Sequence, residues 1–243
     1  MKQTRADEST AFEFASERLT PVLGVVLAGG KSSRMGCDKA SLVHVNGQTY
    51  LQHAISRLLL ITSHVAISGR TVDDGKLLSI PDLIADQGPA VAIWSAVSFA
   101  KQLGFGSILV TPIDTPFLKA EQLRQFLVVS EGQPVCAEIP SGVAHPLIGF
   151  YPVQYEEKLQ AVAAAPRRSL RLWFEQYPYP RIKLDEQTLA DVNTKDDFVN
   201  SQIQNIREQE STDLSYGTSE ADIFPATPQN GTGVSKLPYK GAQ

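Results

Sequence analysis

The segment LAGGKSSRMGCDK, residues 27–39, places glycines and basic side chains directly after an apolar run. Gly29 and Gly30 would let backbone amides approach a bound phosphate, because no Cβ stands in the way. Arg34 and Lys39 could then neutralise the phosphate oxygens. The segment therefore predicts a phosphate-binding site.

The spacing excludes two common phosphate-binding loops. A P-loop requires a lysine directly after its second glycine, and counting from Gly24 puts Gly30 at that place, with Lys31 one position late. The dinucleotide fingerprint G-x-G-x-x-G is also absent. The sequence thus indicates a third kind of phosphate loop.

A carboxylate that suits the same chemistry occurs in TPIDTPF, where Asp114 follows the apolar run SILV. In phosphate sites Mg²⁺ is usually held by one or two carboxylates together with phosphate oxygens. A residue at the carboxyl end of a central strand faces the first loop when the two strands are neighbours. Asp114 is therefore the candidate Mg²⁺ ligand.

These residues need strands and helices to bring them together. Apolar runs at 22–27, 64–68 and 106–117 predict buried strands. Helices are predicted between them, one beginning at Thr49 as N-cap and one over 90–103 behind Pro89. This alternation predicts an α/β fold, a three-layer Rossmann-like arrangement with a mainly parallel sheet and helices on both faces.

The second half continues with shorter elements. Strands are predicted at 134–139 and 145–152, then a helix around 156–162 and another on which Leu170, Trp173 and Phe174 share a face. A last helix begins at Thr194 as N-cap, with an apolar stripe of Val199, Ile203 and Ile206. We predict a flexible N-terminal extension over 1–20, one α/β domain over 21–208 and a disordered tail over 209–243, since 15 of the last 33 residues are Gly, Pro, Ser or Thr.

The composition limits the class of protein. A net charge of -4 and a pI near 5.6 provide no general attraction to nucleic acid. Cys37 and Cys136 form neither a disulfide framework nor a metal motif. With no signal peptide and no run of about 20 apolar residues, we expect a cytoplasmic protein without a membrane partner.

The first loop resembles the signature L-A-G/A-G-x-S-x-R-M-G-x-D/N-K of nucleotidyltransferases that activate sugars and cofactors. Within that superfamily it is most similar to the molybdenum cofactor guanylyltransferases. The resemblance implies the nucleotide-diphospho-sugar transferase-like fold, with Arg34 and Lys39 acting on the phosphates and Leu27, Ala28 and Gly29 under the base. Its LAGG form, in place of LAAG, favours guanine over cytosine.

Further motifs support the resemblance on the nucleotide side. TPIDTPF is similar to the family's P-C-D-T-P-F, and SIPDLIADQGPAVA places Asp82 where the family has an aspartate that binds nucleotide. Ser68 stands where relatives often carry asparagine near the base. Ala92 replaces a glycine of the family's G-P-L-A-G-I motif, which is the clearest departure.

Three stretches resemble the acceptor side of the family, and they supply His145, Arg168 and Asn193 as candidate acceptor-binding residues. His145 begins HPLIGFYP, and Arg168 belongs to a group of arginines after Pro166 whose charge suits a phosphate or an acidic pterin group. Asn193 lies in DVNTKDDF, which is similar to N-x-N-T-P-E-D-L, with Asp191 in place of the first asparagine. His44, His53 and His64 show no partner pattern and receive no role.

The resemblance implies transfer of GMP from GTP to molybdenum-bearing molybdopterin, with Mg²⁺ as cofactor and release of pyrophosphate. Molybdopterin insertion proteins and apo-molybdoenzymes would be the partners that receive the product. Three alternatives remain open: cytidylyl transfer to the same pterin, a non-catalytic nucleotide-binding or cofactor-delivery protein, and a tail that recruits a partner enzyme.

Overall fold

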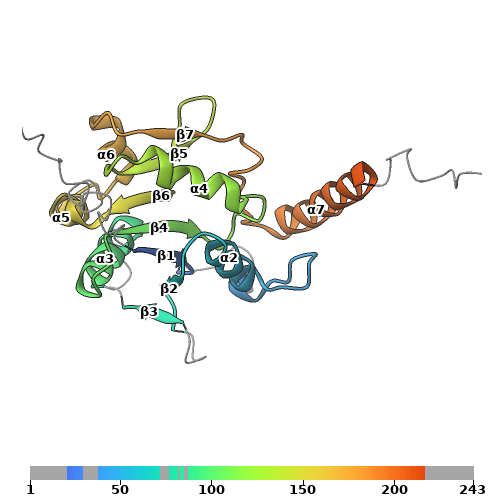
Figure 1. Ribbon diagram of the computed structural model, residues 1–243, viewed down its shortest axis with the longest axis horizontal. Coiled ribbons are helices and arrows are strands. Elements are labelled where there is room, and N and C mark those ends of the chain that lie inside the picture. The colour runs from blue at the N-terminus through green and yellow to red at the C-terminus, as the bar shows by residue number, and fades with distance from the viewer. Residues whose placement is uncertain (1–20, 30–37, 72–76, 82, 85–86, 217–243) are drawn as a thin grey trace, which may run out of the picture. The chain divides into compact units, whose positions relative to one another are not determined.

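The fold is described from a computed structural model (Figure 1). It describes residues 21–29, 38–71, 77–81, 83–84 and 87–216, with side chains as far as Arg207. The chain divides into two units, residues 1–205 and 206–243. The first unit contains the sheet and the site, and the described part of the second is the end of one helix.

A seven-stranded sheet with the order β3-β2-β1-β4-β6-β5-β7 forms the centre of the first unit. Strands β3, β2, β1 and β4 are parallel, whereas β6 runs antiparallel to both of its neighbours, β4 and β5. Its strands are β1 (Val22–Leu27), β2 (His64–Ser68), β3 (Leu78–Ile80), β4 (Ser107–Pro112), β5 (Val135–Glu138), β6 (Ala144–Pro152) and β7 (Arg181–Lys183). The predicted α/β fold with a mainly parallel sheet is confirmed.

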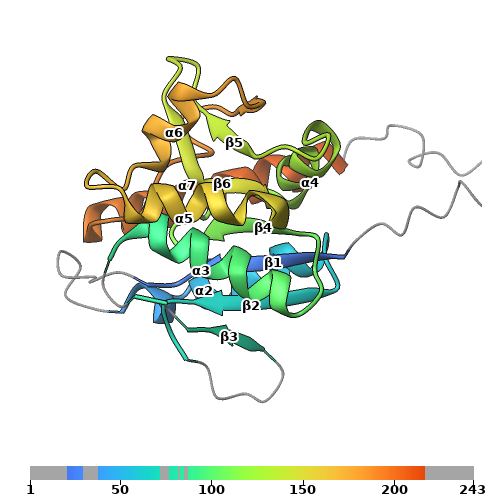
Figure 2. The ribbon, with the colours of Figure 1, turned by 90° about the vertical axis from the view of Figure 1, so that its left-hand side faces the viewer.

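Helices cover both faces of this sheet, as the two perpendicular views show (Figures 1 and 2). On one face lie α3 (Pro89–Gln102), α5 (Glu156–Ala164) and α6 (Leu170–Gln176), and on the other lie α2 (Tyr50–Leu59) and α4 (Ala120–Val129). Each face has its own apolar core, one containing Ile93 and Phe174 and the other Leu58 and Phe126. Two short 3-10 helices, η1 (Lys39–Ser41) and η2 (Val153–Tyr155), connect elements.

The sequence-based predictions identified the longer elements and missed the shortest. The strand predictions at β1, β2, β4, β5 and β6 are confirmed, and so are those of the helices α2, α3, α5 and α6. β3 and β7 have three residues each, too few to show any periodicity, and they form at the two edges of the sheet because a neighbouring strand offers its hydrogen-bonding edge. Their existence depends on tertiary structure.

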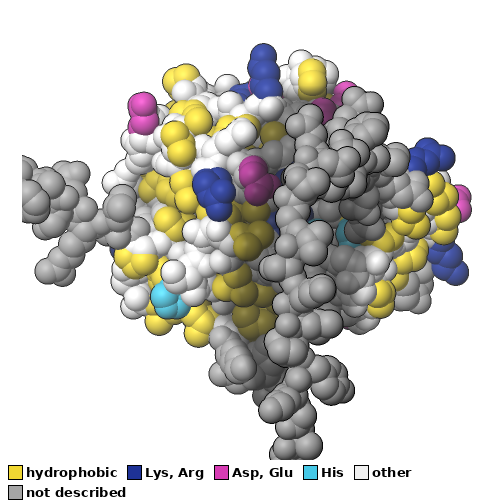
Figure 3. Space-filling model, turned by 45° about the vertical axis from the view of Figure 1, so that its right-hand side comes forward, with side chains coloured by type: hydrophobic (Ala, Val, Ile, Leu, Met, Phe, Trp, Pro, Cys, Tyr) yellow, Lys and Arg dark blue, Asp and Glu magenta, His cyan; other side chains and the backbone are white. Residues whose placement is uncertain are grey.

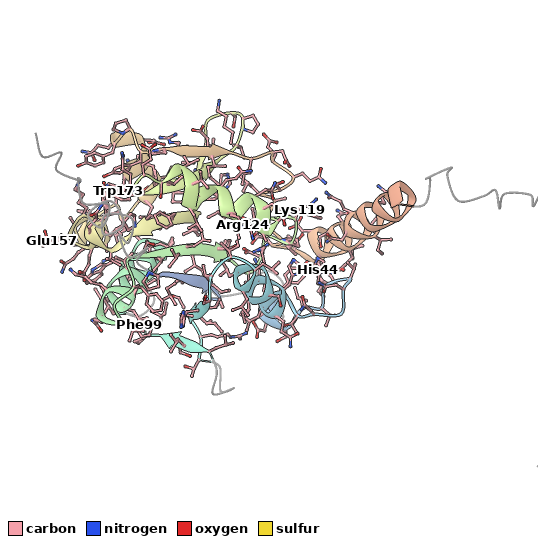
Figure 4. The ribbon with its side chains drawn as sticks, in the orientation of Figure 1. His44, Phe99, Lys119, Arg124, Glu157 and Trp173 are labelled. Carbon is pink, nitrogen blue, oxygen red and sulfur yellow. The ribbon has the colours of Figure 1, made fainter. Side chains whose placement is uncertain are left out.

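Helix ends follow the predicted caps. The Thr49 side chain accepts from the backbone of Gln52, whose own side chain accepts from the Thr49 backbone, a complete capping box. Pro89 begins α3 at a position where its missing N–H costs nothing. Arg124 on α4 caps the carboxyl end of α2, because its Nη2 donates to the Leu60 carbonyl (Figure 4).

The last helix, α7 (Lys195–Tyr216), differs from its prediction in two respects. It continues to Tyr216, past the predicted end at 208, because no glycine or proline interrupts the chain between 195 and 216. Its predicted apolar stripe is largely exposed, with Val199 53% and Ile203 44% accessible. The helix is held instead by the half-buried Phe198, which packs with Tyr50 and Val192, and by the buried Ser201, whose hydroxyl is hydrogen-bonded to the Tyr50 hydroxyl over 3.0 Å.

Two general expectations can be compared with the described part of the chain. No helix in it is long and apolar enough to cross a membrane. Cys136 is fully buried, and burial raises the pKa of its thiol to about 12, so it is an unreactive core residue. On the face drawn in Figure 3, the visible lysine and arginine side chains are scattered rather than gathered into one patch.

Candidate active site

A cavity of about 470 Å³ opens at the carboxyl ends of β1 and β4. These strands are parallel neighbours with Leu27 opposite Pro112, so the loops that leave them meet at one edge of the sheet. Because β6 is antiparallel to β4, its first residues, beginning with His145, line the same cavity. Arg171 of α6 and Asn193, just before α7, complete it.

The first loop leaves β1 by passing very close to the turn after β2. An added Cβ on Gly69 would come within 2.5 Å of the Gly29 backbone nitrogen, and Gly69 has a φ of +85°. A side chain at either glycine would push the two turns apart. The Ala28 N–H donates to the Ser68 carbonyl over 2.9 Å and fixes the same approach.

Lys39 joins two parts of the chain that are far apart in sequence. Its Nζ donates to Asp114 Oδ2 over 2.9 Å and to Asn193 Oδ1 over 2.7 Å. The Lys39 side chain is 13% exposed and that of Asp114 21%, so the ion pair is partly shielded from water. The cluster of Lys39, Asp114 and Asn193 forms the polar floor of the cavity.

Asp38 holds Lys39 in place at the start of η1. The Asp38 side chain accepts from the Ala40 N–H over 3.1 Å and pairs with Arg70 Nη2 over 2.5 Å. The Arg70 hydrogen bond is the largest cause of a lowered pKa at Asp38, which therefore stays ionised as a cap. The lysine is thus anchored to the turn after β2.

Asn193 is fixed by the start of α7. The Asp197 carboxylate accepts from the N–H groups of Asn193 and Thr194, and Thr194 Oγ1 accepts in return from the Asp197 N–H over 3.1 Å. One residue earlier, the Val192 N–H donates to the Asp114 carbonyl over 3.0 Å. The predicted cap at Thr194 is confirmed, and it aligns the segment before α7 with the loop after β4.

A second carboxylate, Asp191, also lines the cavity. Desolvation, together with the charge of Asp114, raises the pKa of Asp191 to about 6. Two carboxylates and an amide oxygen are ligands that suit Mg²⁺, which takes its remaining ligands from phosphate and water. No group of three or more His, Cys, Asp or Glu side chains that could hold a metal ion occurs in the described part of the chain.

The structure brings most of the predicted site residues together. The following line the cavity: Leu27, Ala28, Gly29, Lys39, Asp114, His145 and Asn193. Gly30, Arg34 and Asp82 lie outside the described residues. Ser68 is buried at the end of β2 and does not line this cavity, and Ala92 lies in the first turn of α3.

Arg168, a predicted acceptor-binding residue, does not line this cavity. Helix α6 begins only at Leu170, with Ser169 as its N-cap, so Arg168 occupies the preceding turn with a φ of 30°. Its Nη1 is hydrogen-bonded to the Gln87 side chain. Arg171 takes the expected place: it lines the cavity, and its Nε donates to the Ala144 carbonyl over 3.1 Å.

Arg171 cannot be distinguished from its neighbouring arginines by sequence alone, because the distinction depends on the residue at which α6 begins. Burial lowers the pKa of His145, and the positive charge of Arg171 lowers it further. His145 therefore remains neutral at pH 7 and can act as a hydrogen-bond donor or acceptor at the edge of the cavity.

His44 and His53, which showed no partner pattern, stack on each other outside the cavity. Their ring centroids are 4.5 Å apart with an interplanar angle of 7° (His44 is labelled in Figure 4). Burial lowers the pKa of His53 to about 4, assisted by the charge of Arg57 and by His44. The His53 ring is thus neutral in the folded protein at pH 7.

This neutral ring predicts a loss of stability in mild acid. Between pH 6.5 and about 4, His53 takes up a proton in the unfolded chain but not in the folded protein, so the free energy of unfolding falls as the pH is lowered through this range. Urea unfolding from pH 8 to pH 5 should show a smaller loss in His53→Gln than in the unsubstituted protein. Equal pH dependence in both would contradict the lowered pKa.

Transfer of a nucleotidyl group requires cationic groups for the phosphate oxygens and a carboxylate for a divalent ion. This cavity offers both at the carboxyl edge of a Rossmann-like sheet, so fold and site together define a nucleotidyltransferase. The chain belongs to the MobA-like NTP transferase domain family, whose model matches residues 24–181.

Curated relatives cover nearly the whole domain. A probable molybdenum cofactor guanylyltransferase of Rhodopirellula baltica is 31% identical over 204 residues, which are 79% of this chain and 96% of that protein. The molybdenum cofactor guanylyltransferase of Rhizobium johnstonii is 28% identical over 78% of this chain and 95% of its own.

Solved structures share the fold. Molybdopterin-guanine dinucleotide biosynthesis protein A of Archaeoglobus fulgidus has a TM-score of 0.60 at 18% identity, over 76% of this chain and 99% of its own. A Mycobacterium tuberculosis protein solved as a manganese complex has a TM-score of 0.55 at 16% identity, over 75% and 98% of the two chains. The nucleotide-diphospho-sugar transferase-like fold is thereby confirmed.

Proposed function

We propose that this enzyme transfers GMP from GTP to molybdenum-bearing molybdopterin, giving the molybdopterin guanine dinucleotide cofactor and pyrophosphate. The observation that carries the proposal is the cluster of Lys39, Asp114 and Asn193, which joins the nucleotide loop to the segment before α7 in one cavity. The names of the curated relatives support the choice of substrates. A cytoplasmic location stays part of this proposal.

In the proposed reaction an oxygen of the terminal phosphate of molybdopterin forms a bond to the α-phosphorus of GTP. The bond between that phosphorus and the oxygen bridging to the β-phosphate breaks, and pyrophosphate leaves with the electron pair. The attacking phosphate is already ionised, so no protein base is required. Lys39 holds the phosphates in line, and this positioning supplies most of the acceleration.

The proposed cofactor is Mg²⁺, which Asp114 would hold together with Asp191 at the cavity floor. When bound, it neutralises charge on the α-phosphate and on the leaving pyrophosphate. The roles of Arg34 at the phosphates, and of Asp82 and Ser68 at the nucleoside, are carried by the resemblance of their motifs. Leu27, Ala28 and Gly29 would pack under the base.

On the acceptor side, we assign the phosphate of molybdopterin to Arg171 and His145. Both line the cavity beside Asp114, and Arg171 is held there by its bond to the Ala144 carbonyl. A guanidinium can bind a phosphate through two parallel hydrogen bonds, which makes this residue well suited to the task. Asn193 lies between the two substrates.

Arg171→Met is expected to raise KM for molybdopterin about 10-fold, the loss of one charge-assisted phosphate contact, while KM for GTP stays unchanged. Steady-state kinetics with each substrate varied in turn would measure this. Arg168→Met is the matched control, because Arg168 does not line the cavity. If Arg168→Met raised KM for molybdopterin and Arg171→Met did not, the assignment of Arg171 would be wrong.

The proposed reaction is tested by supplying GTP or CTP with Mg²⁺ and molybdenum-loaded molybdopterin, and following both pyrophosphate and the labelled nucleotide on the pterin. We expect release with GTP only, and only when the pterin is present. Release with CTP would identify a cytidylyltransferase. GTP binding without release from either nucleotide would identify a carrier protein.

A further inference from the structure

Arg57 is a buried cation that lies outside the cavity and has no place in the proposed reaction. It lies on α2, in the last turn, and is 4% exposed. Burial lowers its pKa to about 10, so the guanidinium is still charged at pH 7. Burying a charge without an ionic partner is costly, and within the described ranges no carboxylate pairs with it.

Within the described residues, the side-chain hydrogen bonds of Arg57 go to one stretch of chain, the end of β4 and the loop that follows it. Its Nη1 donates to the carbonyls of Thr115 over 2.8 Å and Leu118 over 2.7 Å, and its Nη2 donates to Thr111 Oγ1 over 2.8 Å. These acceptors stand on both sides of Asp114 in sequence. The guanidinium therefore brackets the segment that carries the carboxylate.

This segment satisfies its Pro112 carbonyl by itself, through the Thr111 and Thr115 hydroxyls, whereas its Thr115 and Leu118 carbonyls accept from Arg57. It runs through Pro112 and Pro116, which have no N–H to donate, and its residues from Thr115 to Leu118 are buried. A buried carbonyl without a donor is unfavourable, so the guanidinium takes the place of water or a neighbouring strand. One turn earlier on α2, the His53 ring interacts with the Pro116 backbone and assists from the same helix face.

We propose that Arg57 is a positioning residue, which holds residues 111–118 in the conformation that places Asp114 against Lys39. The inference extends the proposed function and rests on it only for its kinetic effect. The other backbone ties of the loop, from Ile113 N–H to Leu27 and from Val192 N–H to Asp114, lie on the cavity side. Arg57 supplies the opposing contacts from the buried side, so its loss frees that side of the loop.

The test compares three variants of the full chain with a matched control. Arg57→Met removes every donor, Arg57→Lys keeps the charge with fewer donors, and Thr111→Val removes one acceptor at nearly constant volume. Leu58→Ala is the control, because Leu58 is a fully buried neighbour on α2 that packs in the apolar core and makes no bond to the loop. It lowers stability by leaving a cavity and removes no hydrogen bond of residues 111–118.

The readouts are amide hydrogen exchange over 113–118, Mn²⁺ affinity by paramagnetic resonance, the melting temperature, and kcat with KM for GTP. We expect Arg57→Met to lower kcat about 100-fold, as a misplacement of about 1 Å can do, with faster exchange in the loop, weaker Mn²⁺ binding and little change in KM for GTP. Arg57→Lys should recover part of each effect, and Thr111→Val should lose a few-fold in kcat.

The inference is overturned if Arg57→Met matches Leu58→Ala in loop exchange and Mn²⁺ affinity, differing from the unsubstituted protein in melting temperature alone. If Arg57→Met does not fold, Thr111→Val and Arg57→Lys decide the question by the same readouts. If the unsubstituted protein transfers no GMP, the proposed function fails, while loop exchange still decides the role of Arg57.

Discussion

Replacement of Asp114 by asparagine is expected to lower kcat for GMP transfer about 1000-fold, because a carboxylate that holds a divalent ion contributes several kcal/mol to transition-state stabilisation. The amide oxygen can still accept from Lys39 Nζ, the bond that Asp114 Oδ2 now accepts over 2.9 Å. The backbone bond from Val192 is untouched. The fold should therefore persist, with a melting temperature within a few degrees of the original.

The measurement is single-turnover transfer of labelled GMP at saturating GTP, beside Mn²⁺ titration and circular dichroism. Asp185→Asn is the matched control, because Asp185 accepts from Thr188 outside the cavity. We expect the control to retain transfer and Mn²⁺ binding. Full activity in Asp114→Asn, or an unfolded protein, would remove Asp114 from the mechanism as proposed.

Lys39→Met should lower kcat/KM for GTP about 100-fold, the effect typical of one cationic donor aimed at phosphate in a partly desolvated site. The methionine side chain keeps much of the lysine stem, so packing around η1 changes little. The ammonium is also the group that bridges Asp114 and Asn193, so its loss separates the two halves of the cavity floor. Both kcat and KM should change.

Because Lys39 and Asp114 are in direct contact, their effects should not add. The double variant is expected to be little worse than Asp114→Asn alone, as is usual for residues that act as one unit. Lys101→Met is the control. Lys101 forms an ion pair with Glu156 at an N–O distance of 2.5 Å, and neither residue lines the cavity. Fully additive losses would show that Lys39 and Asp114 act on separate steps.

The fold could be predicted from the sequence wherever one element carries its own signal. β1 and β4 are continuous apolar runs because both faces of a parallel strand are covered. α3 can be recognised from Pro89 at its start and the long apolar stretch that follows. The edge strands β3 and β7 carry no such signal. The exposure of Val199 on α7 could not be predicted either, because a periodic apolar stripe indicates a helix but does not show which element covers the stripe.

Two residues that line the cavity could be predicted from the sequence, because each belongs to a motif that follows a predicted strand. Asp114 follows β4 and Lys39 follows the first loop, and the parallel pairing of β1 with β4 brings them together. Arg171 was not separable from Arg168, because the two differ only in their position relative to the start of α6. Arg57 was missed altogether, since its role depends on a helix packing against a loop more than 50 residues away.

The reversed direction of β6 has a consequence for how such enzymes can diversify. In an all-parallel sheet every segment at the carboxyl edge follows a strand and leads into a crossover, whereas β6 starts at this edge directly after a tight hairpin from β5. The Ile139 N–H donates to the Val143 carbonyl across this hairpin, and Gly142 supplies a φ of 87° in its turn. Insertions in a surface hairpin are tolerated at small entropic cost. Residues at the start of β6 can therefore change with their hairpin while β1 and β4 stay fixed, so that one lineage can keep its nucleotide chemistry and acquire new acceptors.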